Sequence, residues 1–257
     1  MNTIKLILLF LISVPAFDAT AEIYYGTLRG EKIIELKSPF SGVIENMLTI
    51  DGKINENSSP VKIKSLELES KVEILIIKIN TLKSKLSRLM NEYKTAQIHY
   101  DKGFISNAEL NERKDAISEA EISLQELKIE LTALKKTLDM GTPLIANKFL
   151  IRQFYTVDKQ IVNAGDRIVS VEIVDDFYID IKFDPVTLKG RLQDKEITVR
   201  SLVTGQTAKS AVFKISNPVD NNNTQGSKIA SLIVKTDEID LPQLLDTVFE
   251  VEINDRS

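Results

Sequence analysis

The stretch LKSKLSRLMNEYKTAQIHYDKGFISNAELNERKDAI, residues 82–117, lies at the centre of a longer segment, residues 66–138, that decides the fold. Apolar residues recur along this segment at alternating spacings of four and three residues. Such a seven-residue repeat predicts helices that pack against each other as a coiled coil. The seam of the first arm comprises Leu68, Val72, Leu75, Ile79, Leu82, Leu86, Leu89, Tyr93, Ala96 and Tyr100. The seam of the second arm has one polar member and comprises Leu110, Arg113, Ile117, Ala120, Leu124, Leu127, Leu131, Leu134 and Leu138.

The two seams also predict how the arms pair. Arms that fold back about one point pair positions whose numbers have a constant sum. Leu89 with Ile117 and Leu82 with Leu124 both sum to 206. Half of 206 is 103, and residue 103 is a glycine, which adopts the left-handed conformation of a tight turn freely. The sequence therefore predicts an antiparallel coiled-coil hairpin over residues 65–140 that turns at Gly103.

The net charges of the two arms have opposite signs. Residues 65–102 contain seven Lys or Arg against five Asp or Glu, a net charge of +2, and residues 103–140 contain five against eight, a net charge of −3. We expect this complementarity to favour pairing of the arms. The apolar seam should still contribute most of the stability, because exposed ion pairs each contribute only ~0–1 kcal/mol.

Composition excludes several classes of protein. Of the 257 residues, 43% are hydrophobic and 27% are charged, which predicts a folded chain. The net charge of −4 indicates neither nucleic acid nor an anionic membrane as a partner. The sequence has no cysteine and a single histidine, His99, which argues against thiolate or two-histidine metal sites and against His-dependent relays. We therefore expect no enzymatic activity and no metal or other cofactor.

Residues 1–21 are typical of a cleavable secretory signal. Lys5 precedes an apolar run, residues 6–14, and the small-residue site Ala19-Thr20-Ala21 follows it. Cleavage before Glu22 would release a soluble protein into a secretory compartment, which in a bacterium is the periplasm. The alternative is a retained membrane anchor, although the run is well short of the ~20 residues that span a bilayer.

Short strands are predicted on both sides of the hairpin. Residues 22–64 and 141–173 each contain few apolar residues, and the hairpin returns the chain to its starting place. We therefore expect both sets to form one small β-domain into which the hairpin is inserted. A weak internal repeat relates residues 48–54 to residues 162–168.

Residues 174–257 are predicted to form a further unit. So many short strands after one short helix close most naturally as a small β-barrel. The helix is expected near residues 186–192 and a polar exposed loop at residues 220–226. The strands are expected at residues 177–183, 196–202, 211–215, 229–236 and 247–253.

The order of these parts resembles that of the HlyD-type periplasmic adaptors, also called membrane fusion proteins, over essentially the whole mature chain. The stretches that carry the resemblance are SPFSGVI at 38–44, DGKI at 51–54, GFISNAEL at 103–110, LIA at 144–146, AGD at 164–166 and LLDTVFEV at 244–251. Two positions depart from the family pattern. Asn147 stands where the second half-motif has proline, and Asp246 replaces the glycine that usually precedes the closing strand.

The resemblance implies an α+β fold. A lipoyl-like (barrel-sandwich hybrid) domain of residues 22–64 and 141–173 is split by the hairpin, and a β-barrel of residues 174–257 follows. A lipoyl-like fold also raises the possibility of a swinging-arm cofactor carrier. Carrier domains present a modified lysine on a tight turn, and here the hairpin occupies that place, so we expect no cofactor.

The resemblance further implies a function. The chain would be a non-enzymatic, homo-oligomeric adaptor subunit of a trans-envelope export or secretion system. It would couple an inner-membrane transporter to an outer component such as an outer-membrane channel. The alternative is a periplasmic scaffold or assembly factor for surface polymer or appendage export, which uses the same architecture without an exit duct.

The hairpin tip is the candidate partner-binding site, and it comprises Gly103, Phe104, Ile105 and Ser106. Family adaptors that dock end-on to an exit duct carry an Arg, a Leu four residues later and a Ser seven residues after that. Here Thr95 and His99 take the first two places and only Ser106 is kept. We expect the tip to contact a partner unlike the common duct through Phe104 and Ile105. The alternative is that these two side chains fold under the turn and cap the seam.

Overall fold

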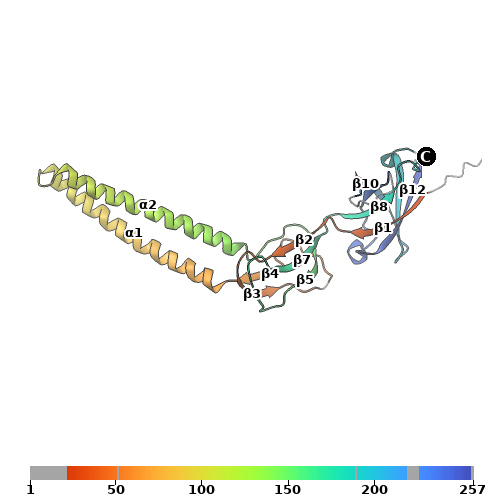
Figure 1. The fold of residues 1–257 in the computed structure, drawn as a ribbon, viewed down its shortest axis with the longest axis horizontal. Coiled ribbons are helices and arrows are strands. Elements are labelled where there is room, and N and C mark those ends of the chain that lie inside the picture. The colour runs from red at the N-terminus through yellow and green to blue at the C-terminus, as the bar shows by residue number, and fades with distance from the viewer. Residues whose placement is uncertain (1–21, 51, 189, 219–225, 256–257) are drawn as a thin grey trace, which may run out of the picture. The chain divides into compact units, whose positions relative to one another are not determined.

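The computed structural model describes residues 22–50, 52–188, 190–218 and 226–255. The predicted signal, residues 1–21, and most of the predicted polar loop lie outside these ranges. The described residues form two compact units, one from the two ends of the chain, residues 22–30 and 176–255, and one from residues 31–175. The second unit contains the hairpin and a β-domain (Figure 1).

The hairpin consists of helix α1, Leu66–Asp101, and helix α2, Asn107–Asp139, which lie side by side (Figure 1). Every predicted seam residue except Tyr100 is buried or partly buried, whereas most other side chains of the two helices are exposed. The most buried seam residues are Leu75, Ile79, Ala96, Leu110, Ala120 and Leu124. This alternation confirms the predicted coiled-coil seam, and burial of its apolar side chains supplies the main stabilising term.

The opposite charges of the arms do not pair across the hairpin. Among the described residues, the ion pairs made within the two helices are Lys71–Glu67, Arg88–Glu92 and Arg113–Glu109. Each joins residues four apart on a single helix. The expectation that complementary charge favours pairing of the arms therefore has no support from cross-helix ion pairs, and the seam holds the arms together.

The β-domain of this unit contains two antiparallel three-stranded sheets, in the orders β2-β7-β5 and β4-β3-β6. Each sheet combines strands from before and after the hairpin, as the sequence predicted. The strands are β2 Lys32–Lys37, β3 Gly42–Met47, β4 Val61–Lys64, β5 Phe149–Phe154, β6 Ile161–Val162 and β7 Arg167–Ile173. Their core includes Ile44, Phe149, Val162, Val169 and Val171.

The base of the hairpin is fixed to this β-domain. Leu68 of α1 and Leu138 of α2 both pack against the core of the two sheets. Gly141, just beyond α2, accepts a 2.8 Å hydrogen bond at its carbonyl from the Ile63 backbone. A β-carbon at Gly141 would lie 2.5 Å from the Phe40 ring, so only glycine allows this close approach.

The first unit is a closed six-stranded antiparallel barrel in the order β1-β12-β9-β10-β11-β8. Its core includes Leu28, Ile179, Val199, Leu232, Phe249 and Val251, all with no exposed surface. The strands are β1 Glu22–Arg29, β8 Phe177–Phe183, β9 Lys195–Ser201, β10 Thr207–Ser216, β11 Lys228–Val234 and β12 Val248–Asp255. Short 3-10 helices occur at η1 Leu192–Asp194 and η2 Leu241–Leu244.

Two predicted elements of this region differ in the structure. Strand β1 was assigned with the split β-domain, as part of residues 22–64, but it pairs with β12 and β8 in the barrel. Apolar alternation reveals a strand without revealing its partners, which explains the error. The helix predicted near residues 186–192 is replaced by turns and by η1.

The family pattern cited above has a glycine just before strand β12. Asp246, which replaces a glycine of that pattern, has a φ of 63°, in the left-handed region that favours glycine. Its amide donates a 2.9 Å hydrogen bond to the Leu28 carbonyl of β1. Gly52 and Gly165, which occupy equivalent places in the predicted internal repeat, also share a positive φ, of 71° and 90°.

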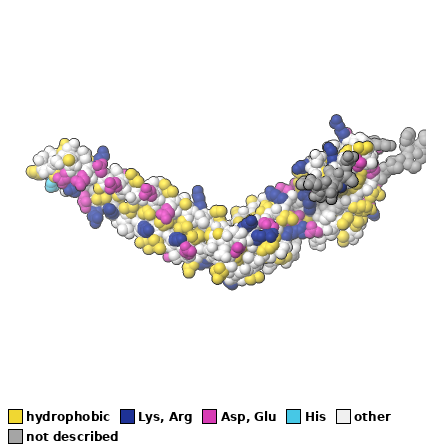
Figure 2. Space-filling view, viewed as in Figure 1, with side chains coloured by type: hydrophobic (Ala, Val, Ile, Leu, Met, Phe, Trp, Pro, Cys, Tyr) yellow, Lys and Arg dark blue, Asp and Glu magenta, His cyan; other side chains and the backbone are white. Residues whose placement is uncertain are grey.

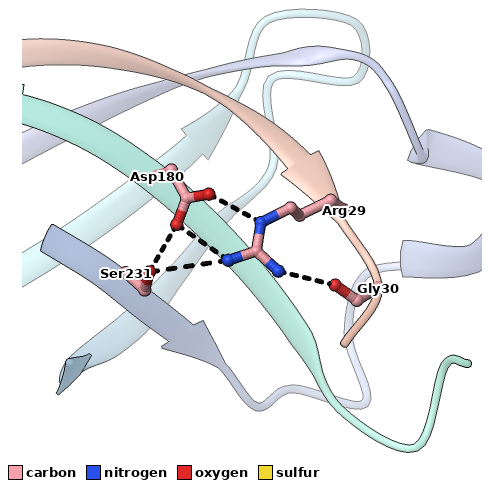
Figure 3. A network of polar contacts seen from close by, with 4 residues as sticks. All are labelled: Arg29, Gly30, Asp180 and Ser231. Carbon is pink, nitrogen blue, oxygen red and sulfur yellow. Dashed lines mark hydrogen bonds and ion pairs between the residues drawn. The ribbon is translucent and has the colours of Figure 1, made fainter. Parts of the chain in front are cut away.

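A polar network joins three strands on the wall of the barrel (Figure 3). Arg29 of β1 donates from Nε and Nη2 to the two carboxylate oxygens of Asp180 on β8, at 2.6 and 3.0 Å. Ser231 of β11 donates to Asp180 Oδ1 at 2.6 Å. The Arg29 guanidinium also lies 5.4 Å from the centre of the Tyr178 ring. These contacts fix β1 to its neighbours by charge-assisted hydrogen bonds.

The network should make the stability of the barrel depend on pH. Burial raises the pKa of Asp180, but the hydrogen bonds from Arg29 and Ser231 and the guanidinium charge lower it by more, so its pKa lies below the ordinary value. A carboxyl whose folded-state pKa is depressed stabilises the fold above its unfolded pKa and loses that contribution as the pH falls through the folded value. In urea unfolding at neutral pH, Asp180→Asn should be less stable than the unchanged chain, and the difference should shrink below about pH 4. A difference that stays constant down to about pH 3 would contradict this assignment.

Candidate functional site at the hairpin tip

The turn between α1 and α2 is a helix C-terminal motif built on Gly103. The Gly103 amide donates to the Tyr100 carbonyl at 2.8 Å, and the Phe104 amide donates to the His99 carbonyl at 2.9 Å. This pair of bonds defines a Schellman motif, whose central residue must adopt a left-handed conformation. Gly103 has a φ of 73°, which confirms the predicted turn residue. No described atom would crowd a β-carbon there, so the requirement for glycine is conformational.

The second helix starts at a side-chain cap. Ser106 is the N-cap residue of α2, and its Oγ accepts a 3.2 Å hydrogen bond from the Glu109 backbone amide. An N-cap serine satisfies one of the free amides at the start of a helix and stabilises it by about 1 kcal/mol. Lys102 to Ser106 are therefore held between two specific helix ends.

Phe104 points away from the seam. Its side chain is 73% exposed, and its ring meets the His99 ring edge-on at a centroid distance of 6.1 Å. This contact is the one that usually accompanies a Schellman motif, between the residue after the turn and the last turn of the helix. Ile105 is partly buried. The turn thus presents an exposed phenyl ring on a fixed backbone. The Ile105 side chain is more buried than that of Phe104.

Thr95 and His99 stand where the family adaptors carry the Arg and the Leu, and each contacts groups of the hairpin itself. The Thr95 hydroxyl donates to the Asn91 carbonyl of its own helix at 3.1 Å. His99 is exposed and carries Phe104 against its ring. Neither side chain reproduces the forked donor of an arginine or the apolar surface of a leucine.

A groove of about 660 Å³ lies beside the tip. Its lining includes Arg113, the one polar member of the predicted seam. Arg113 Nη2 donates to Glu109 Oε1 at 3.1 Å, and its Nε is buried with no hydrogen-bond partner among the described atoms. We did not predict this groove as part of the site. The signal in the sequence that could have indicated it is Arg113, a charged residue in an otherwise apolar seam. The lining comprises Ser84, Ser87, Arg88, Asn91, Glu92, Thr95, Ala96, His99, Ile105, Glu109 and Arg113.

The chemistry of the tip is that of a contact surface. It offers an aromatic ring, an aliphatic side chain, hydroxyl groups and two Arg–Glu pairs, Arg113–Glu109 on α2 and Arg88–Glu92 on α1. Within the described ranges, no group of three or more His, Asp or Glu side chains is placed to hold a metal ion. No helix in the described part of the chain is both long enough and apolar enough to cross a membrane.

The amino-acid sequence matches no protein-family profile and no curated protein. Solved structures do match it. The membrane fusion protein Spr0693 from Streptococcus pneumoniae R6 has a TM-score of 0.71 at 15% identity, over 92% of this chain and 100% of that one. MacA from Actinobacillus actinomycetemcomitans has a TM-score of 0.74 at 13% identity, over 91% of this chain and 78% of that one. A putative efflux transporter from Bacteroides eggerthii DSM 20697 has a TM-score of 0.64 at 13% identity, over 91% and 69%.

These similarities establish the fold. The chain has the architecture of the membrane fusion proteins, with a helical hairpin inserted in a split β-domain and a closed six-stranded barrel. The predicted α+β class and the resemblance to the HlyD-type adaptors are confirmed at the level of the fold. At this level of identity, the roles of individual residues must be argued from the chain itself.

Proposed function

We propose that the protein is a non-enzymatic periplasmic adaptor of a trans-envelope export system. It would act as a homo-oligomer that couples an inner-membrane transporter to an outer component. The observation that carries the proposal is the full-length match in fold to a membrane fusion protein, over 92% of this chain and all of the other. Within such an assembly the protein transports nothing itself and holds its partners together.

The tip is the part of the hairpin that we assign to the outer partner. The exposed ring of Phe104 stands on a turn whose backbone is fixed by Gly103 and Ser106. A fixed aromatic side chain can bury a large apolar area on binding without losing much conformational freedom. Thr95 and His99 lack the groups of the usual end-on contact, so we propose an outer partner unlike the common duct.

The tip assignment predicts a loss of function without a loss of stability. Phe104→Ser removes an exposed ring, so its melting temperature should stay close to that of the unchanged chain. Export in a strain that depends on the protein should fall strongly, because the removed ring contributes about 1.5–3 kcal/mol when it is fully buried against a partner. Thermal unfolding and an export assay in cells measure the two effects.

A matched control is Met90→Ser, which removes another exposed apolar side chain from α1, thirteen residues before Gly103. This variant should keep both stability and export. A drop in melting temperature for Phe104→Ser that matches its loss of export would instead indicate that the ring caps the seam. Full export by Phe104→Ser would rule out the ring as a partner contact.

The coupling function has its own test. Immunoprecipitation of the tagged protein from its native host should recover an inner-membrane transporter, and deletion of the gene should block export of that transporter's cargo. Recovery of fibre or polysaccharide assembly proteins without a transporter would favour the scaffold function.

A further inference from the structure

The six strands of the barrel divide into two halves of opposite charge. Strands β8, β11 and β10 are neighbours in the closed order, and together they contain four Lys and one Asp, a net charge of +3. The other three neighbours, β1, β12 and β9, contain three Lys or Arg and five Asp or Glu, a net charge of −2. The net charge of −4 for the whole chain averages over this separation, so it conceals a basic surface on one side of the barrel.

Three lysines of the basic half are left unpaired by the fold. Lys182 of β8, Lys214 of β10 and Lys228 of β11 are exposed, and none of their side chains makes a hydrogen bond or ion pair with a described residue. The aspartate of this half, Asp180, is held by the network of Figure 3 and does not pair with any of them. These three positive charges are therefore available to an anionic partner.

The strand register places the outward side chains of the basic half in three rows, about 7 Å apart, that cross β8, β11 and β10. The side chains between the rows, such as Ile179, Ile181 and Leu232, face the core. The rows are Tyr178–Ile233–Ala211, Asp180–Ser231–Lys214 and Lys182–Ile229–Ser216. We call this surface, together with Phe213 and Lys228, the basic wall.

A β-bulge adds an aromatic ring to the basic wall. The pairing of β10 with β11 shifts between Val212 and Lys214, so Phe213 is the extra residue of the bulge. Val212 and Ile215 both pack against the core, which leaves Phe213 and Lys214 as consecutive residues on the outer side. Phe213 is 61% exposed, and its ring lies 5.0 Å from the Tyr178 ring. The bulge therefore presents a supported aromatic ring to solvent beside a lysine.

An exposed ring among unpaired lysines fits the surface of an anionic membrane. An aromatic ring enters the boundary between headgroups and acyl chains, and each lysine close to the lipid phosphates strengthens binding about fivefold. The centres of protein–protein interfaces are instead depleted in lysine, so the composition of the basic wall favours lipid over a protein partner. Basic and hydrophobic side chains are both present on the surface of the barrel that Figure 2 shows.

We propose that the basic wall binds the surface of a membrane that contains anionic phospholipids. Phe213 enters the headgroup layer, and Lys182, Lys214 and Lys228 contact lipid phosphates. The acidic half, strands β1, β12 and β9, lies on the far side of the barrel from the lipid. The contact is peripheral, because a single ring inserts. This inference goes beyond the proposed adaptor function and does not rest on it.

Co-sedimentation with lipid vesicles tests the contact. The purified chain of residues 22–257 is used, because the apolar run at residues 6–14 would bind lipid by itself. It should bind vesicles of phosphatidylcholine and phosphatidylglycerol, mixed in a ratio of about seven to three, about tenfold more tightly than vesicles of phosphatidylcholine alone. Binding to the anionic vesicles should weaken as the salt concentration rises, because salt screens the attraction.

Two variants of the basic wall should reduce this binding. Lys182→Gln with Lys214→Gln should weaken it about thirtyfold, because two ammonium groups near the phosphates are lost. Phe213→Ser should weaken it about tenfold, because the inserted ring is lost. The lysine variant changes exposed side chains only, so its thermal unfolding should match that of the unchanged chain.

Each variant has a matched control. Tyr25→Ser removes an exposed aromatic side chain from β1, on the acidic half of the barrel. Lys83→Gln with Lys94→Gln removes the same charge from exposed positions of α1. Both control proteins should bind anionic vesicles as tightly as the unchanged chain.

The proposal is overturned if the unchanged chain binds neither kind of vesicle, if it binds both kinds equally, or if the controls lose as much binding as the variants of the wall. Crosslinking of the basic wall to a transporter in cells, with no vesicle binding by the purified chain, would assign this surface to a protein partner and reject the lipid contact. Because the vesicle assay contains the purified chain alone, its result does not depend on whether the adaptor function is correct.

Discussion

Leu124→Asp is expected to melt the hairpin while the barrel stays folded. Leu124 is among the most buried residues of the seam, and the predicted register of the two arms pairs it with Leu82. An aspartate at this position would place a carboxylate between apolar side chains without a partner, at a cost of about 3–5 kcal/mol. A two-helix seam has no second layer that could accommodate the charge. Because α1 and α2 contain 36 and 33 residues, a large part of the far-ultraviolet helix signal should disappear.

Gln125→Asp is the matched control, since it puts the same charge one residue along the same helix on an exposed position. It should leave the melting temperature nearly unchanged. If both variants melt alike, the seam position of Leu124 is wrong. Leu82→Cys with Leu124→Cys should also form a disulfide within one chain, and crosslinking only with a partner one heptad away would show a different register.

Arg152→Ala should destabilise the split β-domain more than any exposed charge does. Its guanidinium pairs with Glu172 of the central strand β7, whose residue surface is 1% exposed. Removing the guanidinium takes away the cationic contact that Arg152 makes with this buried carboxylate. Breaking a buried ion pair from one side costs about 3–5 kcal/mol. Chemical denaturation followed by a probe in this domain measures the loss.

The same sheet supplies the control. Arg167 of β7 pairs with Glu35 and stacks on the Tyr155 ring at an exposed surface, so Arg167→Ala should cost about 1–2 kcal/mol. Replacing both Arg152 and Glu172 with methionine should be far less harmful than Arg152→Ala alone, because no buried charge remains. Equal losses for Arg152→Ala and Arg167→Ala would show that burial of Glu172 does not matter.

The elements that were predicted correctly are those whose signal is local and repeated. The heptads of residues 66–138 fixed both helices, their seam and the turn at Gly103, because every heptad repeats the same requirement. The barrel strands after residue 176 followed from alternation and turn residues in the same way. For the tip, the sequence predicted the glycine turn, since it depends on residues only a few positions apart, whereas the serine cap at Ser106 was not predicted.

The features that were missed depend on residues far apart in the chain. The assignment of β1 to the barrel requires knowing that Leu28 packs beside Ile179, and alternation along residues 22–29 carries no such information. The Arg29–Asp180–Ser231 network likewise joins residues 151 and 202 positions apart. Opposite net charges on the arms suggested ion pairs between them, but side-chain geometry favoured pairs within each helix.

Strand β1 also constrains the order in which the chain can fold. Its neighbour β8 begins only after residues 30–176. Its other neighbour, β12, lies near the C-terminal end of the chain. The hairpin contacts are between nearby parts of the chain and can form early, whereas the barrel must wait for its last strand. Strand β1 therefore remains an unpaired edge until the C-terminal part of the chain is available. We therefore expect the molecule to mature from the tip inward, with closure of β12 onto β1 as the final and slowest step.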